Sequence, residues 1–216
     1  MLDVWCVLWG EKYSADYVRV LKAMIERHLK TQHRFRCVTN KVIDGVDTVN
    51  PIKHWHGWWQ KLTLFELARG RSLYFDLDVV ITGELDYLVP YTRNVLAAPA
   101  NWGQSGHGGI QSSVMAWNGT LREPYERFDY DVDSKRLWGD QEFLSEMYGE
   151  NYTKLPGIYS YKYHCTTGLP TDCSVAVFHG KPDPHEVNDA WVKAARSTSI
   201  QPCPTRSNLA SMSSLD

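Results

Sequence analysis

Two acidic residues two positions apart, Asp76 and Asp78, are the side chains of this sequence with the clearest chemical potential. They interrupt the apolar stretch SLYFDLDVVITGELDYLV at residues 72–89, which is typical of a buried strand. Side chains alternate along a strand, so both carboxylates should point the same way, where like charges repel and unpaired burial is costly. A hard divalent cation, bound by both carboxylates and by the phosphates of a substrate, would offset that cost. The alternative is that both acids lie in water beyond the strand, or that one caps the next turn.

The segments before the two acids predict an α/β fold. The apolar run at residues 2–9 indicates a buried first strand that ends at Gly10. The apolar stripe of residues 16–29 indicates a helix with Ser14 as its N-cap, and FRCVTN at residues 35–40 indicates a second strand. Strand, helix and strand in this order favour a mostly parallel sheet, in which ligands bind beyond the carboxyl ends of the strands.

Four further elements are expected along the chain. They are a helix at residues 57–70, a strand at 110–118, a helix at 140–149 and a strand at 175–180. Asp140 is the expected N-cap of the third helix, and the loop WGQSGHGG, with four glycines, suits a lid or an acceptor contact. After about residue 196 the chain turns to Ser, Thr and Pro. We therefore expect one domain over residues 1–196 and a disordered tail over 197–216.

The composition is that of an ordinary globular domain of 216 residues, with 43% hydrophobic and 22% charged residues. A net charge of −2 gives no general support for nucleic-acid binding, which is typical of basic chains. The nine Trp and 12 Tyr either fill the core or line a site that stacks on sugars or bases. The five cysteines form no CxxC pair, and neither a secretory leader nor a membrane span is recognisable, so a reduced, cytoplasmic protein is expected.

Two other metal sites are conceivable. One would be a zinc site built from His164, Cys165, Cys173 and His179, although their spacing fits no standard zinc pattern. The other would use His54 and His56 in the segment KHWHGWW. The alternative for that segment is a loop that covers a ligand, with its tryptophans either stacked on the ligand or packed into the protein.

An apolar strand that ends in Asp-x-Asp is typical of two enzyme families. One is the haloacid dehalogenase-like phosphatases, in which Asp76 would be the nucleophile, but Val79 stands where that family has Gly. The other is the nucleotide-sugar glycosyltransferases with a single Rossmann-like domain, the GT-A fold. Five segments resemble the retaining family 8 enzymes and their phage and bacterial relatives, in the same order: GWWQKL, YFDLDVVI, IQSSVMAWN, GDQEFL and VFHGKPDP.

The resemblance implies a site. Asp76, Asp78 and His179 would bind Mn²⁺ or Mg²⁺, and Asp140 and Gln141 would lie beside the reacting sugar. The donor nucleotide sugar would be bound by Val7, Trp9, Tyr13, Lys61, Asp76, Gln111, Ser112, Gly180 and Lys181. Gln111 stands where the family has Asn, Ser113 stands where it has Gly, and the closing motif is compressed. These departures leave the sugar and the role of Lys181 open.

The implied function is metal-dependent transfer of a sugar, with retention, from a nucleotide-diphosphate sugar, most simply a UDP-sugar, to a hydroxyl acceptor. The acceptor would be a glycan, a lipid-linked sugar, a small molecule or a hydroxymethylated base in phage DNA, the last in the cytoplasm of a host. Six basic residues could form a rim for DNA phosphates: Arg69, Arg71, Arg122, Arg127, Lys135 and Arg136. A non-catalytic module that binds a nucleotide sugar is a further alternative.

Overall fold

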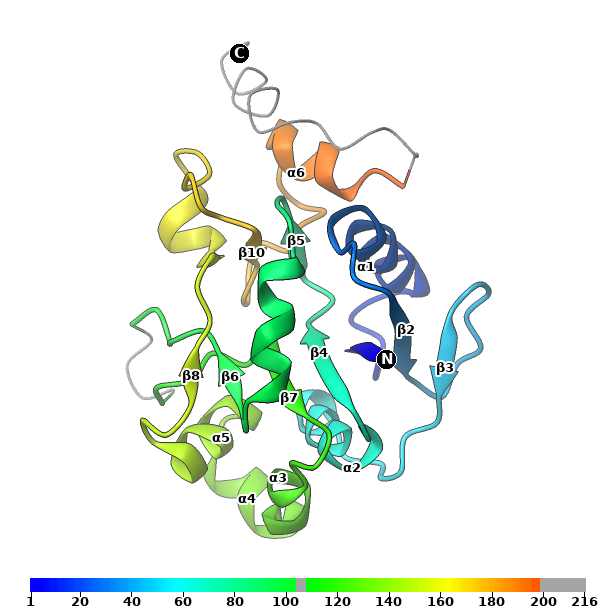
Figure 1. The fold of residues 1–216 in the computed structure, drawn as a ribbon, viewed down its shortest axis with the longest axis vertical. Helices are drawn as coiled ribbons and strands as arrows, with labels where there is room; N and C mark the ends of the chain where they lie inside the picture. Colours follow the sequence, from blue (N-terminus) through cyan, green and yellow to red (C-terminus); the bar gives the residue numbers. More distant parts are fainter. Residues whose placement is uncertain (104–107, 199–216) are drawn as a thin grey trace.

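The computed structural model of the protein describes residues 1–103 and 108–198. Part of the glycine-rich loop and nearly all of the expected tail therefore lie outside the described residues. Two sheets form the framework (Figure 1). The larger has the order β3 (Asp47–Val49), β2 (His33–Val38), β1 (Leu2–Val7), β4 (Arg71–Phe75), β7 (Val114–Asn118), β6 (Ala97–Ala98) and β8 (Thr153–Lys154). The smaller has the order β5 (Val79–Ile81), β10 (Val175–Val177) and β9 (Ile158–Ser160).

The larger sheet is mixed and mostly parallel, as predicted. Its antiparallel pairs are those that β7 makes with β4 and with β6, whereas β1, β2, β3 and β4 run parallel. The first helix, α1 (Ala15–His28), begins at the predicted N-cap, where the Ser14 hydroxyl accepts a hydrogen bond from the Asp16 N–H at 3.3 Å. The other helical elements are η1 (Gly57–Thr63), α2 (Leu64–Leu67), η2 (Asp86–Arg93), α3 (Glu123–Arg127), α4 (Tyr130–Arg136), α5 (Asp140–Tyr148), η3 (Tyr161–Cys165) and α6 (Ala190–Arg196).

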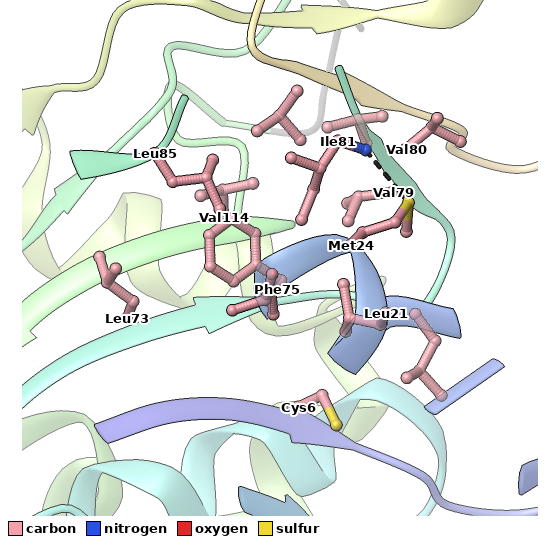
Figure 2. Close-up of a cluster of buried hydrophobic side chains, with 14 of the residues drawn as sticks. Cys6, Leu21, Met24, Leu73, Phe75, Val79, Val80, Ile81, Leu85 and Val114 are labelled. Carbon is pink, nitrogen blue, oxygen red and sulfur yellow. Dashed lines mark hydrogen bonds between the residues drawn. The ribbon is translucent and has the colours of Figure 1, made fainter. Parts of the chain in front are cut away.

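Both faces of the sheet are buried, which explains why its central strands are almost wholly apolar. Along β4, Leu73 and Phe75 belong to the core beneath α1, while Tyr74 belongs to a second core beneath α2 and α5. Figure 2 shows Phe75 in the first core, near Leu21 and Met24 of α1 and near the β5 side chains. The Met24 sulfur accepts a hydrogen bond from the Ile81 N–H at 3.5 Å and ties α1 to β5.

The long apolar stretch at residues 72–89 is not one strand. β4 ends at Phe75, the chain turns through Asp76, Leu77 and Asp78, and β5 then pairs with β10 in the smaller sheet. The expected strand alternation therefore does not place the two acids. They lie instead in the turn where the chain passes from one sheet to the other, and residues 86–93 form η2.

Other boundaries also differ from the expectation. The helix expected at residues 57–70 is mainly the 3₁₀ helix η1, followed by only one α-helical turn, α2. The strand expected from residue 110 begins at Val114, because the Gln111 side chain accepts a hydrogen bond from the Ser113 N–H at 2.7 Å and turns the chain. The N-cap of α5 is Gly139 rather than Asp140, and its N–H donates to Glu142 at 2.6 Å. Within residues 1–103 and 108–198, every helix is too short or too polar to cross a bilayer.

His28, at the end of α1, should make the fold sensitive to acid. The side chain is 6% exposed, and burial, followed by the charge of Arg27, lowers its pKa from 6.5 to about 4. Because the unfolded chain binds this proton more readily, stability should fall by on the order of 2 kcal/mol as the pH falls from about 6.5 to 4. A His28→Leu variant should lose less over the same range, measured as thermal unfolding midpoints at several pH values. Equal losses in both proteins would show that His28 is not responsible.

Candidate active site

A cavity of about 410 Å³ opens at the carboxyl ends of β1 and β4. Three segments line it: residues 7 and 9–13, residues 56–58 with Lys61, and residues 74 and 76–78. The residues predicted to hold the donor that line this cavity are Val7, Trp9, Tyr13, Lys61 and Asp76. The structure thus brings together residues separated by about seventy positions, at the sheet edge where ligands bind in α/β folds.

Lys61 is the centre of the charged groups in this site. Its Nζ lies 3.2 Å from Asp76 Oδ1 and 3.1 Å from Asp140 Oδ2, and it donates to Ser112 Oγ at 3.2 Å. Lys61 is 5% exposed and Asp140 is 3% exposed. Burial alone would lower the pKa of Lys61, but attraction to Asp140 and then to Asp76 outweighs burial and raises that pKa. The ammonium therefore stays charged and joins the segments of η1, α5 and the β4–β5 turn.

Asp76 is held firmly by hydrogen bonds to its side chain and to its backbone. The Tyr74 hydroxyl donates to Asp76 Oδ1, and the Asp76 N–H donates to the Ser113 carbonyl at 2.8 Å. Burial, followed by the charge of Asp76, raises the pKa of Tyr74, so the phenol keeps its proton and remains a donor. Tyr74 is a part of the site that the sequence pattern did not indicate, although it stands only two residues before Asp76.

Asp78 is only half satisfied. Its Oδ2 accepts a hydrogen bond from the Tyr13 hydroxyl at 3.1 Å, whereas its Oδ1 is buried and has no hydrogen-bond partner among the described residues. Burial, followed by the charge of Asp76, raises the pKa of Asp78 to about 7. A desolvated carboxylate oxygen beside a second carboxylate fits a divalent cation, because the cation would replace the missing partner and reduce the repulsion.

His179 follows a residue that contacts this pair, but His179 itself does not line the cavity. The Phe178 N–H donates to the Asp78 carbonyl at 3.1 Å, so His179 follows directly after a residue bonded to Asp78. Its ring packs against Trp102, and its Nε2 lies 2.6 Å from Ser160 Oγ. Burial, followed by the charge of Lys162, lowers the pKa of His179 to about 4, so the ring is neutral at pH 7 and able to ligate a metal.

Within the described residues, no three His, Cys, Asp or Glu side chains are grouped closely enough to hold a metal ion. The structure therefore brings Asp76 and Asp78 together and does not complete the set with His179, whose ring is turned toward Ser160. The zinc set of His164, Cys165, Cys173 and His179 is likewise not assembled. In the described part of the chain His54 and His56 gain no third ligand either; His54 packs against Trp9, and His56 lies in the cavity wall.

The remaining predicted residues do not line the cavity; some contact the residues that do, and others lie farther along the chain. Ser112 contacts Lys61, and Gln111 is buried, with its Nε2 donating to Ser113 Oγ at 2.9 Å. Gln141 lies on α5, where its carbonyl accepts from Ser145 Oγ at 2.7 Å. Gly180 follows His179 with φ of +72°, a conformation that suits glycine.

Asp183, in the segment VFHGKPDP, is a site residue to which the motif resemblance assigns no role. It is 3% exposed, its Oδ1 accepts from the Tyr13 hydroxyl at 3.0 Å, and Lys12 lies 3.5 Å from the same atom. The Tyr13 hydroxyl thus bridges Asp78 and Asp183. In the sequence, Asp183 could be noticed only as an acid that follows the His-Gly-Lys-Pro segment. No hydrophobic periodicity there indicates that its side chain is buried.

The segment KHWHGWW lies beside the cavity, but it is a loop only up to His56, because Gly57 begins η1. Trp55 packs against Phe128 and Tyr130, and Trp59 stacks on Phe128 with ring centroids 4.9 Å apart. Trp58 alone of the three lines the cavity, with 60% of its surface exposed. Its indole N–H donates to the Trp138 carbonyl at 2.8 Å, which holds the ring at the cavity mouth.

The architecture and the placement of the Asp-x-Asp pair define a protein with the GT-A fold, the single Rossmann-like domain of nucleotide-sugar glycosyltransferases. No family model matches the sequence, and no curated protein matches it. The protein is therefore similar to known proteins in its structure and not detectably in its sequence. It decides in favour of the glycosyltransferase fold over the phosphatase fold that the same motif suggested.

Three solved structures illustrate the match. The galactosyltransferase LgtC, solved with donor and acceptor sugar analogues, gives a TM-score of 0.58 at 17% identity over 85% of this chain and 89% of LgtC. The glycosyltransferase GlyE of Streptococcus pneumoniae TIGR4 gives 0.67 at 14% identity over 98% of this chain and 61% of GlyE. The bifunctional glycosyltransferase WbbM gives 0.59 at 13% identity over 85% of this chain and 46% of WbbM.

Proposed function

We propose that this protein is a metal-dependent glycosyltransferase that moves a sugar from a nucleotide-diphosphate sugar to a hydroxyl acceptor. The observation that carries the proposal is the buried Asp78 Oδ1 beside Asp76, in the wall of a cavity of about 410 Å³, with no hydrogen-bond partner in residues 1–103 and 108–198. That geometry suits a cation bound to a phosphorylated ligand, and it occurs at the ligand-binding edge of a glycosyltransferase fold.

Asp76 and Asp78 would hold Mn²⁺ or Mg²⁺, and a turn of the neutral His179 ring away from Ser160 would add a nitrogen ligand. A nitrogen ligand favours Mn²⁺ over Mg²⁺. When bound, the ion acts as a Lewis acid that stabilises negative charge on the diphosphate leaving group. The role of Lys61 is to hold the Asp76 carboxylate in place, because the ammonium contacts that carboxylate directly.

The donor nucleoside would occupy the part of the cavity formed by Val7, Trp9 and Tyr13, with Trp58 across from them. A UDP-sugar and retention of configuration are what the family resemblance implies. Asp140 and Gln141 begin α5 beside Lys61, and we assign Asp140 the task of positioning Lys61, since its carboxylate is bound to that ammonium.

The acceptor is proposed to be an uncharged hydroxyl compound, most simply a glycan, rather than DNA. Five of the six basic residues considered for a DNA rim are already engaged. Arg69 and Arg122 pair with Glu66, and Arg127 pairs with Glu123 at 2.9 Å. Arg136 pairs with Asp133 and Glu146, and Arg71 donates to Thr92 and to a backbone carbonyl. Paired cations contribute little counterion release, so they favour a neutral acceptor.

The proposal is tested with UDP-, GDP-, ADP- and dTDP-linked hexoses, each incubated with the full chain and Mn²⁺ while free nucleoside diphosphate is followed. We expect slow release from one donor, abolished by EDTA and accelerated by a glycan more than by hydroxymethylated DNA. Binding of a donor that stays unconsumed with every acceptor would instead support the non-catalytic module. If no donor releases a nucleoside diphosphate and the protein instead cleaves p-nitrophenyl phosphate in an EDTA-sensitive reaction, the result would support the phosphatase alternative.

A further inference from the structure

Lys181, the lysine of the closing motif, is already engaged by two acids. Its Nζ donates to Asp183 Oδ2 at 2.7 Å and to Glu186 Oε1 at 2.6 Å. The Asp183 N–H also donates to Glu186 Oε2 at 2.7 Å, so Lys181, Asp183 and Glu186 form one hydrogen-bonded cluster. For Lys181 to bind a phosphate it would have to leave the buried Asp183, and that exchange offsets much of the gain.

A second lysine, Lys162, is fixed close to the same segment by the smaller sheet. Ser160, at the end of β9, lies opposite Val177 of β10. The next ring, Tyr161, stacks on Phe178 with centroids 4.1 Å apart, and the Ser160 hydroxyl contacts His179. Lys162 follows immediately, so its backbone is tied to the residues that lead from β10 into the closing motif.

The Lys162 ammonium lies against the backbone of Gly180. A Cβ at Gly180 would be 3.2 Å from Lys162 Nζ, so the glycine allows the ammonium to lie close to this backbone. The Phe178 N–H is bonded to the Asp78 carbonyl, which sets Gly180 two residues beyond a direct contact of the Asp-x-Asp pair. Among residues 1–103 and 108–198, no carboxylate pairs with Lys162. It is thus an uncommitted cation at the edge of the proposed metal site.

The charges of the proposed site favour such a cation. Lys61 and one divalent ion together balance Asp76, Asp78 and Asp140, while Lys12 and Lys181 balance Asp183 and Glu186. A bound diphosphate adds negative charge that none of these groups is left to neutralise.

We propose that Lys162 is the side chain that neutralises the diphosphate of the bound donor and product. This inference rests on the proposed function and deepens it. It assigns to a lysine outside the recognisable motifs the contact that the family resemblance gives to Lys181. The Gly180 backbone, in its positive-φ conformation, leaves room for the ammonium and the phosphate to meet.

The test compares three methionine variants, which keep the side-chain stem and remove the charge: Lys162→Met, Lys181→Met and, as a matched control on α6, Lys193→Met. Dissociation constants are measured by calorimetry with Mn²⁺ for UDP, GDP, ADP and dTDP and for the corresponding nucleosides. For the nucleotide that the wild type binds, we expect Lys162→Met to weaken binding about tenfold, as for one charge-assisted contact. Nucleoside binding should not change, and Lys181→Met should lose clearly less than Lys162→Met.

A loss in Lys162→Met no greater than in Lys193→Met would overturn the inference, as would a larger loss in Lys181→Met. Thermal unfolding of each variant shows whether a loss of binding reflects a loss of fold. The role of Lys162 and the proposed function can be refuted independently of each other. A wild type that releases a nucleoside diphosphate while Lys162→Met binds it normally refutes only the role of Lys162. A wild type that binds no nucleoside diphosphate refutes the proposed function as well.

Discussion

Replacing Asp78 by Asn should lower metal-dependent release of nucleoside diphosphate by on the order of 100-fold while leaving the protein folded. Asn keeps the shape of the side chain and can still accept the Tyr13 hydrogen bond, but it removes one of the two carboxylates at the cavity wall. The loss should appear in the rate of release from the donor identified by the panel. Asp44→Asn, in an exposed turn away from the cavity, serves as the matched control and should retain the full rate.

The same substitution should stabilise the protein when no metal is present. Burial and the charge of Asp76 raise the pKa of Asp78 from 3.8 to about 7. A raised acid pKa contributes stability at low pH that is lost as the pH rises toward the folded-state value, so ionised Asp78 weakens the fold at pH 8. In EDTA at pH 8, Asp78→Asn should therefore unfold at a higher temperature than the wild type, and the difference should shrink at pH 5.

Mn²⁺ separates the two effects. It should raise the unfolding temperature of the wild type, because a ligand that binds only the folded state stabilises it, and it should raise that of Asp78→Asn much less. An Asp78→Asn protein that keeps the wild-type rate, or that responds equally to Mn²⁺, would show that the unpartnered oxygen is not a metal ligand. A protein less stable than the wild type in EDTA would contradict the electrostatic account of the site.

The side chains that line this site were easier to predict from the sequence than the strands and turns that carry them. The apolar runs that became β1 and β4 were recognisable because both faces of these strands are covered, so almost every residue is apolar. By contrast, Asp47–Val49 and Thr153–Lys154 are short edge strands with polar residues and only partly buried positions, and no periodicity marks them. Their pairing is set by neighbouring strands rather than by local preference.

The break between β4 and β5 shows a different limit. An uninterrupted apolar stretch favours one strand, and nothing local indicates that Val79–Ile81 pairs with Val175–Val177 almost a hundred residues later. The two acids mark the place where the chain changes sheets. The conclusion that Asp76 and Asp78 lie close together held, although the strand alternation used to reach it does not apply to a turn.

Contacts between side chains that are far apart in the sequence could not be predicted from the sequence. Lys61, Ser112 and Asp140 were each identified from separate segments, but their convergence on one ammonium depends on how η1, the residues before β7 and α5 pack. Asp140 illustrates the point, since helix-capping rules favoured it as an N-cap. The structure instead uses Gly139 there and directs the Asp140 carboxylate to Lys61.

Lys61→Met should be the most destabilising single change in this site. It leaves the buried carboxylates of Asp76 and Asp140 without their shared counter-charge, and removal of one partner from a buried ionic group costs about 3–5 kcal/mol. The surface pair of Lys22, which is partly exposed, and Glu26, 3.0 Å apart on α1, provides the control, because Lys22→Met should cost less than about 1 kcal/mol. Urea unfolding at pH 8 measures both. The cost of Lys61→Met should be smaller at pH 5, where burial, which already raises the pKa of Asp140, makes that carboxyl easier to protonate.

A second substitution tests whether the charges, rather than packing, cause this loss. The double variant Lys61→Met/Asp140→Asn carries one buried carboxylate fewer, so it should recover much of the stability that Lys61→Met loses. If the double variant is no more stable than Lys61→Met alone, the lysine acts through its packing and the ionic triad is not what holds η1 to α5. Recovered stability should not restore release of nucleoside diphosphate, because Asp76 would still lack the ammonium that fixes its carboxylate at the cavity wall. Stability and activity measured on the same double variant therefore separate the structural role of Lys61 from its role in holding a metal-binding aspartate in place.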